Sequence, residues 1–112
     1  MRIVAVSEGE TLDSYVADDF GHAPFILVID SDTLDYHVIE NEFADSPEGA
    51  GVAVAKAITT LEPDVVLVGG IGMHGMQILN QAGIQVSFDE EGPIEQCIID
   101  FKRRRRNNGL AA

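Results

Sequence analysis

The sequence predicts a single α/β domain in which a mixed five-stranded sheet carries helices on both faces and the elements follow the order βββαβαβα. Three observations carry this prediction. The chain has 112 residues, of which 46% are apolar, and this size suits one domain with its own core. Short apolar runs bounded by turn residues indicate strands. Apolar residues at spacings of three and four, beginning near residue 46, indicate helices.

The first half of the chain predicts three strands. Residues 3–6 form a continuous apolar run, which is typical of a central strand buried on both faces. A turn at residues 20–24, which contains glycine and proline, precedes a second apolar run at residues 25–29. Asp, Ser and Thr at residues 30–33 favour another turn before the strand-prone segment Tyr36–Glu40. We therefore expect the second and third strands to form a hairpin.

The second half predicts alternating helices and strands. A first helix runs from about residue 49 to residue 62, and a buried strand follows at residues 65–68. A glycine-rich segment opens a second helix at residues 73–82, which Gly83 should end. A fifth strand is expected at residues 84–88. The apolar positions that define the first helix are Ala50, Val54, Ala57, Ile58 and Leu61.

Gly92 and Pro93 begin the last helix. Its apolar stripe consists of Ile94, Cys97, Ile98 and Phe101. The basic residues 102–106 continue this helix, where cations complement the negative end of the helix dipole. Contact with the acidic body, docking of a partner and capture of an anionic ligand are the alternatives for this basic run. We expect one domain over residues 1–106 and a flexible tail over residues 107–112.

The expected connections also predict where a ligand would bind. Helical crossovers join the first, fourth and fifth strands, so these should be parallel, with the antiparallel hairpin on one side. Ligands of such sheets usually bind beyond the carboxyl ends of the strands. The loops after the first and fourth strands should converge there.

Charge is distributed unevenly along the chain. The formal net charge is −12, but residues 1–101 contain all 19 acidic residues against only Arg2 and Lys56, so this part alone carries about −17. Such a surface should repel nucleic acid backbones, and we expect no nucleic acid partner. The first apolar run ends at Ser7, too early for a signal peptide or a membrane span. These features predict a cytoplasmic protein without membrane contact.

Residues 70–75 match the pattern G-x-G-x-x-G directly after a predicted strand, with acidic residues at 89–91 about twenty positions later. This combination is the fingerprint of dinucleotide binding. However, the motif follows the fourth strand, and only 37 residues come after it, which is short for a Rossmann unit. An anion site built from backbone N–H groups and a turn that needs glycine for packing are the other interpretations. The candidate ligand-binding glycines are Gly21, Gly69, Gly70, Gly72 and Gly75.

Four side chains are candidate metal ligands. His22 lies in the turn before the second strand and His74 in the first turn of the second helix, so both could face the same end of the sheet. Met73 and Cys97 add sulfur donors, which suit Cu(I) or a metal–sulfur species. Core packing is the competing interpretation for Cys97, and a solvated or capping role is the alternative for the histidines. Because Cys97 is the only cysteine, an internal disulfide and a CxxC zinc site are excluded.

No catalytic pattern is present. The chain has no Ser–His–Asp elbow, Walker lysine or HExxH motif. A Mg²⁺-dependent nuclease would need a carboxylate cluster, for which the candidates are Asp13, Asp18, Asp19 and Asp30. The first strand has no internal acid, and the acidic surface opposes a nucleic acid substrate. We predict a protein that is not an enzyme.

Several short motifs occur in order along the chain. They are Phe20-Gly21-His22-Ala23-Pro24-Phe25, Gly49-Ala50-Gly51 and Val68-Gly69-Gly70-Ile71-Gly72, followed by Leu79 and Ala82-Gly83-Ile84. Together they resemble the dinitrogenase iron–molybdenum cofactor biosynthesis family, and the likeness extends from about Arg2 to Phe101. Nitrogenase-associated members often have a histidine immediately before the Phe-Gly pair, where this chain has Asp19.

The resemblance implies a ribonuclease H-like α/β fold and a small carrier or accessory protein. Such a protein holds an iron–molybdenum cofactor, its precursor or a related metal–sulfur cluster, including a molybdenum–copper sulfide cluster, during cofactor assembly. Metallocluster donor or acceptor proteins are the implied partners. With one cysteine, this chain would hold a cluster through few protein ligands and the sulfides of the cluster itself.

We therefore expect a non-enzymatic metallocluster carrier that binds its ligand between residues 20–24 and 69–75, as a monomer or a weak homodimer. His22 and His74 would be ligands, and backbone N–H groups would bind cluster sulfides. The alternative is a small-molecule or nucleotide-binding regulatory module that uses the glycine-rich turn without metal. Replacing both histidines by alanine separates the two hypotheses, because only cluster retention depends on imidazole.

Overall fold

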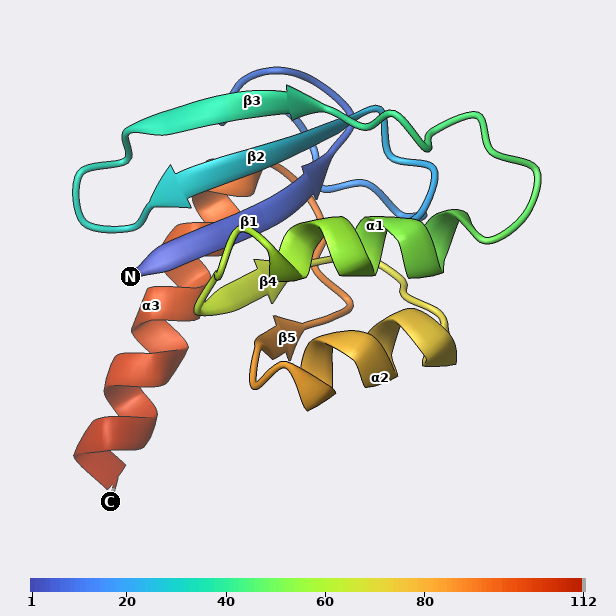
Figure 1. Cartoon of the computed structure of the whole chain (residues 1–112). Helices are drawn as coiled ribbons and strands as arrows, with labels where there is room; N and C mark the ends of the chain where they lie inside the picture. Colours follow the sequence, from blue (N-terminus) through green and yellow to red (C-terminus); the bar gives the residue numbers. More distant parts are fainter. Residues whose placement is uncertain (112) are drawn as a thin grey trace.

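The computed structural model, which describes the backbone of residues 1–111 and the side chains of residues 1–107, contains one five-stranded sheet. Its strand order is β3-β2-β1-β4-β5 (Figure 1). β1 pairs with β2 in the antiparallel sense and with β4 in the parallel sense, and β5 is parallel to β4. The predicted fold class and the predicted central position of the first strand are confirmed. The strands are β1 (Arg2–Ser7), β2 (Phe25–Asp30), β3 (Tyr36–Glu40), β4 (Val65–Leu67) and β5 (Gln85–Ser87).

Helices cover both faces of the sheet. The helices α1 (Ala50–Thr59) and α2 (Met73–Gln81) lie on one face, and α3 (Ile94–Ala111) crosses the other (Figure 1). Side chains of β1 alternate between two cores because successive residues of a strand point to opposite faces. Val4 and Val6 pack toward α1 and α2, whereas Ile3 and Ala5 pack toward α3. All four are fully buried.

Three elements are shorter than the sequence predicted. α1 ends at Thr59, after which the N–H groups of residues 60–62 bond to carbonyl oxygens three residues earlier. Glu62, with a φ of 52°, then leads the chain into Pro63. β4 ends at Leu67, and β5 includes only Gln85–Ser87. The segment after β5 leaves the sheet through Asp89, which adopts a φ of 60°. Gly83, with a φ of 77°, follows α2 in the left-handed conformation that ends many helices, as predicted.

α3 continues through the basic run and remains in contact with the body there. Lys102 Nζ donates a hydrogen bond of 2.8 Å to the carbonyl oxygen of Ser31. The tail that we expected at residues 107–112 lies mostly outside the described side chains, and the bounds of α3 include its backbone as far as Ala111. In the part of the chain that the structure describes, no helix is long and apolar enough to cross a membrane.

Candidate functional site

The loops after β1 and β4 meet at the carboxyl end of these two strands, as the sequence predicted. The N–H of Gly69 donates to the carbonyl oxygen of Ala17 at 3.2 Å, and the N–H of Gly70 donates to that of Asp18 at 2.9 Å. Asp19 and Gly70 also form an isolated parallel bridge. The two predicted turns therefore lie side by side.

The two glycines after β4 pack closely against the loop that follows β1, and the packing is tighter at Gly69 than at Gly70. A Cβ at Gly69 would lie 2.8 Å from the carbonyl oxygen of Ala17, and one at Gly70 would lie 3.1 Å from that of Asp18. At Gly69 a side chain would force the backbone to move, whereas at Gly70 a small shift of the neighbouring carbonyl would admit a Cβ. The packing requirement is therefore strongest at Gly69, which directly precedes the glycine motif of residues 70–75. At Gly72, by contrast, a Cβ would have no neighbouring atom within 4 Å.

The turn at residues 20–24 is fixed against the start of α1. A Cβ at Gly21 would lie 2.6 Å from the backbone nitrogen of Gly51. Asn41, which is 7% exposed, donates from Nδ2 to the carbonyl oxygens of Gly21 at 3.0 Å and Ala23 at 2.8 Å. The sequence analysis did not identify Asn41. The only sequence signal for this role is the position of Asn41 directly after the third strand.

The N-termini of α1 and α2 lie together beside these turns. A Cβ at Gly75, in the first turn of α2, would lie 3.4 Å from the carbonyl oxygen of Gly51 in α1. Neither helix has a side-chain cap or an acidic residue in its first turn. Helix N-termini carry unpaired N–H groups and partial positive charge, and therefore favour anions. Sequence analysis identified the N–H groups near residues 70–75 but not the neighbouring start of α1.

His22 has hydrogen-bond acceptors at both ring nitrogens. Nδ1 lies 2.9 Å from Asp19 Oδ2, and Nε2 lies 3.0 Å from the carbonyl oxygen of Ser46. The hydrogen bond to Asp19 raises the pKa of His22, and the same bond lowers the pKa of Asp19. Because a carboxylate and a carbonyl both accept hydrogen bonds, this geometry favours an imidazole with N–H groups at both nitrogens, which is the positively charged form.

Met73 and His74 extend from the first turn of α2. Met73 is 69% exposed, and His74 is also exposed. His22, Met73 and His74 therefore belong to the same end of the sheet and are accessible to a ligand.

Cys97 is on the opposite side of the sheet from these three residues. It is 4% exposed in the core beneath α3, and its thiol donates to the carbonyl oxygen of Glu91 at 3.2 Å. Burial raises the pKa of the Cys97 thiol to about 11. Since a thiolate is the form that binds metal, this position suits core packing.

The candidate site offers a few scattered metal donors and two helix N-termini. Within the described residues, no group of three or more His, Cys, Asp or Glu side chains is arranged to hold a metal ion. The site instead combines imidazole, a thioether and two helix N-termini, which can donate N–H hydrogen bonds to an anion. Asp18 and Asp19 are exposed nearby, so the favourable charge is confined to the helix ends and His22.

The acidic residues after β5 do not all face the glycine turn. The N–H groups of Asp89 and Glu90 bond to the carbonyl oxygens of Gly69 at 2.8 Å and Val68 at 3.0 Å. The side chain of Glu90 instead packs toward α3, where Oε1 lies 3.2 Å from Arg104 Nη2. Its burial raises the pKa of Glu90. Glu90 is thus not presented to the glycine turn as the ribose-binding acid of a dinucleotide site.

Solved structures of similar proteins share this fold. The apo form of the orange protein from Desulfovibrio gigas is 31% identical, with a TM-score of 0.85 over 91% of this chain and 87% of that chain. A Thermotoga protein provisionally named as a NifB protein is 26% identical, with a TM-score of 0.76 over 91% of this chain and 87% of that chain. The comparison with curated proteins gave no match.

A family model described as dinitrogenase iron-molybdenum cofactor matches residues 1–104. The match includes both glycine-containing turns, the starts of α1 and α2, and the sheet that positions them. It extends from the first residue into the basic part of α3. The chain therefore belongs to the dinitrogenase iron–molybdenum cofactor family.

Proposed function

We propose that this protein is a non-enzymatic carrier that holds a metal–sulfur cluster during cofactor assembly and releases it to an acceptor protein. The cargo would be an iron–molybdenum cofactor, its precursor or a related cluster such as a molybdenum–copper sulfide. Membership of the family supports the class of cargo. The single observation that carries the proposal is the pair of uncapped helix N-termini beside exposed imidazole and thioether donors.

In this proposal the chain binds the cluster mainly through its sulfides. The N–H groups at the starts of α1 and α2 would donate to sulfide, and the positive charge of His22 would offset the anionic charge of the cluster. His74 and Met73 would ligate metal. His22 becomes a metal ligand only after it loses a proton and one of its bonds to Asp19 or Ser46. Few strong bonds would favour release.

Anaerobic reconstitution tests this proposal. The full chain is incubated with tetrathiomolybdate and Cu(I), with iron and sulfide, or with neither, then desalted and examined by elemental analysis and visible absorption. We expect stoichiometric retention of one cluster class. His22→Gln combined with His74→Ala should reduce retention by about tenfold or more, consistent with the loss of metal ligands and their supporting contacts.

Two matched variants serve as controls. His37→Ala removes the third histidine, which is exposed on β3, and Cys97→Ala removes the buried thiol. Both should retain the cluster as the wild type does. A colourless, metal-free wild type after both incubations would contradict the carrier function. Tight binding of a nucleotide that survives the double histidine substitution would instead support the regulatory-module alternative.

A further inference from the structure

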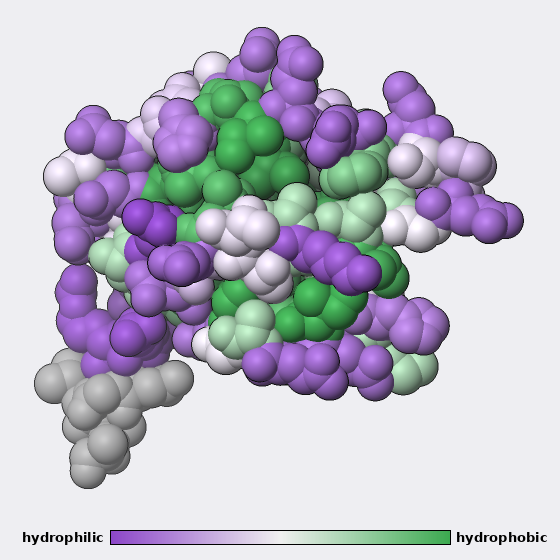
Figure 2. All heavy atoms as spheres, in the orientation of Figure 1, coloured by the Kyte–Doolittle hydropathy of each residue, from purple (hydrophilic) through white to green (hydrophobic). Residues whose placement is uncertain are grey.

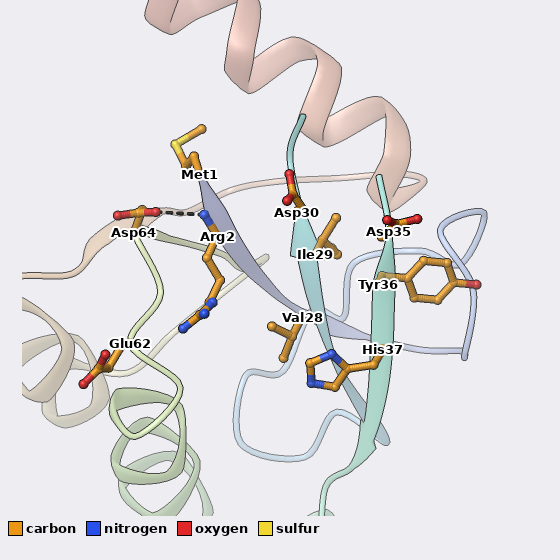
Figure 3. Close-up of a pocket in the computed structure, with 10 residues that line it drawn as sticks. All are labelled: Met1, Arg2, Val28, Ile29, Asp30, Asp35, Tyr36, His37, Glu62 and Asp64. Carbon is orange, nitrogen blue, oxygen red and sulfur yellow. Dashed lines mark hydrogen bonds between the residues drawn. The ribbon is translucent and has the colours of Figure 1, made fainter. Parts of the chain in front are cut away.

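An acidic groove lies at the end of the sheet opposite the glycine-rich turns. It has a volume of about 660 Å³ and is bounded by the start of β1, the end of β2, the start of β3 and the segment after α1. Glu62 and Asp64 lie on the α1 side, and Asp30 and Asp35 lie on the hairpin side (Figure 3). The apolar surface above α1 on this face is surrounded by hydrophilic residues (Figure 2).

Two carboxylates of this groove are available to a partner. Arg2 is the only Lys or Arg among the lining residues, and its guanidinium donates to the carbonyl oxygen of Leu61 at 2.6 Å. Asp64 accepts the backbone N–H of Arg2 at 2.8 Å. Asp35 and Glu62 are exposed, and neither side chain has a hydrogen bond or ion pair to any other described side chain or backbone group.

α3 presents a face whose charge is complementary to that of the acidic groove. This helix covers the other face of the sheet, at the same end of the molecule as the groove. Ile99, Arg103 and Arg106 follow the spacing i, i+4, i+7 and therefore lie along one side of the helix. Ile99 is 41% exposed, and the Arg103 side chain is 65% exposed with only a 3.9 Å contact to Asp100. Arg106 is exposed and has no ion pair within the described residues. This face combines one apolar side chain with two available cations.

This helix face is held away from the groove of its own chain. Lys102 binds the carbonyl oxygen of Ser31, and Arg105 Nη1 lies 3.3 Å from Met1 Sδ. These contacts fix α3 against the face of the sheet opposite α1 and α2. A second hollow, lined by residues that include Met1, Lys102 and Arg106, adjoins the acidic groove through Met1. The acidic groove and the exposed face of α3 are therefore neighbours at one end of the molecule, but they point in different directions.

We propose that the acidic groove binds the Ile99, Arg103 and Arg106 face of α3 from a second copy of this chain. Because both surfaces lie at the same end, a two-fold axis near Met1 allows each copy to insert its helix face into the groove of the other. Ile99 would cover the apolar floor at Val28, and the two arginines would pair with Asp35 and Glu62. This arrangement is the helix-in-groove mode of recognition.

The dimer is weak, because each copy carries a formal charge of −12. At physiological ionic strength the Debye length is about 8 Å, so repulsion between distant charges is screened more than attraction between touching ion pairs. The cluster site lies at the other end of β1 and stays open in this dimer. The dimer and the carrier function therefore fail or succeed independently.

Sedimentation analysis of the full chain across protein concentrations tests the proposal. The wild type should show a monomer–dimer equilibrium at physiological ionic strength, where repulsion between the distant acidic residues is screened. Arg103→Gln combined with Arg106→Gln should weaken dimerisation by about tenfold or more, because the two contacts occur twice. Lys56→Glu gives the same formal charge of −14 by changing an exposed residue of α1 and should weaken it much less.

A charge-swap experiment separates pairing between copies from any effect on folding. Arg103→Glu with Arg106→Glu, and Asp35→Lys with Glu62→Lys, should each give monomers. A mixture of the two double variants should form a dimer again, because both reciprocal contacts then join opposite charges. A wild type that stays monomeric at about millimolar concentration, equal effects of Lys56→Glu and the arginine substitutions, or a mixture that stays monomeric would each overturn the proposal.

Discussion

His22 is the residue of the candidate site whose chemistry depends most on its neighbours. Its two ring nitrogens join the turn that contains Asp19 to the segment that contains Ser46, which follows His22 by 24 positions. The ring therefore links two loops, and its contact with Asp19 favours the positively charged form of His22. Asp19 accepts a hydrogen bond from this ring and thereby raises the pKa of His22.

The pKa of His22 should be measurably raised above its usual value of 6.5. A histidine-detected NMR titration measures it, and Asp19→Asn should bring the pKa down because the substitution removes the principal cause of the shift. Asp13→Asn, on an exposed residue away from this pair, is the control and should leave the titration unchanged. An Asp19→Asn protein with the same His22 pKa as the wild type would show that the bond does not form in solution.

The same pair gives stability a defined pH window. A raised histidine pKa contributes stability that is complete below 6.5 and is lost as pH rises through the pKa of folded His22. The lowered pKa of Asp19 contributes stability above 3.8, which is lost as pH falls through the pKa of folded Asp19. The His22–Asp19 pair therefore stabilises the fold most between pH 3.8 and pH 6.5, the ordinary pKa values of the two side chains.

Among the elements, α1 packs closely against the turn that precedes β2. This close packing requires a glycine at position 21 of the turn. Gly21 and Gly51 are in contact, yet a Cβ has opposite consequences at the two positions. At Gly21 it would lie 2.6 Å from the nitrogen of Gly51, whereas at Gly51 nothing lies within 4 Å of it. The start of α1 can therefore approach the turn only because Gly21 lacks a side chain.

Substitution of these two glycines by alanine should change stability in opposite directions. Gly21→Ala should lower the free energy of unfolding by about 1–3 kcal/mol, because rigid backbone must move. Gly51→Ala should raise it by up to about 1 kcal/mol, because alanine favours the helix and meets no obstruction. Urea unfolding of both variants measures the difference. Equal effects of the two substitutions would contradict the close contact between the turn and α1.

For the whole molecule, stability should fall from the centre of the sheet toward its edges. β1 has a strand on each side and helices on both faces, and its residues from Ile3 to Ser7 are 0% exposed. β3 is an edge strand with no fully buried residue. Local opening requires less free energy where fewer buried contacts are lost.

Hydrogen exchange followed by NMR measures this gradient. We expect the amides of β1 to exchange only on global unfolding, and those of β3 to exchange through local opening at a lower free energy. The measurement is made at a protein concentration too low for the proposed dimer. Equal protection of β1 and β3 under these conditions would contradict the gradient.

The sequence by itself determined the elements and their connections. Short apolar runs, apolar spacings of three and four, and turn residues such as Gly83 specify strands and helices through interactions between near neighbours. Helical crossovers then dictated which strands are parallel. The placement of the two glycine-containing turns at one edge followed from this order. The same order led us to expect His22 and His74 at that end, whereas Met73 was predicted only as a sulfur donor.

Only the tertiary structure decided which groups meet across long sequence separations. Asn41 holds the turn at Gly21, Ser46 engages His22, and Cys97 lies in the core under α3. It also set the N-terminus of α1 beside that of α2, which no local pattern indicates. These contacts depend on strand register and on how closely backbones approach, and such properties belong to the packed chain. Local sequence cannot encode them, because each contact requires both partners to be in place.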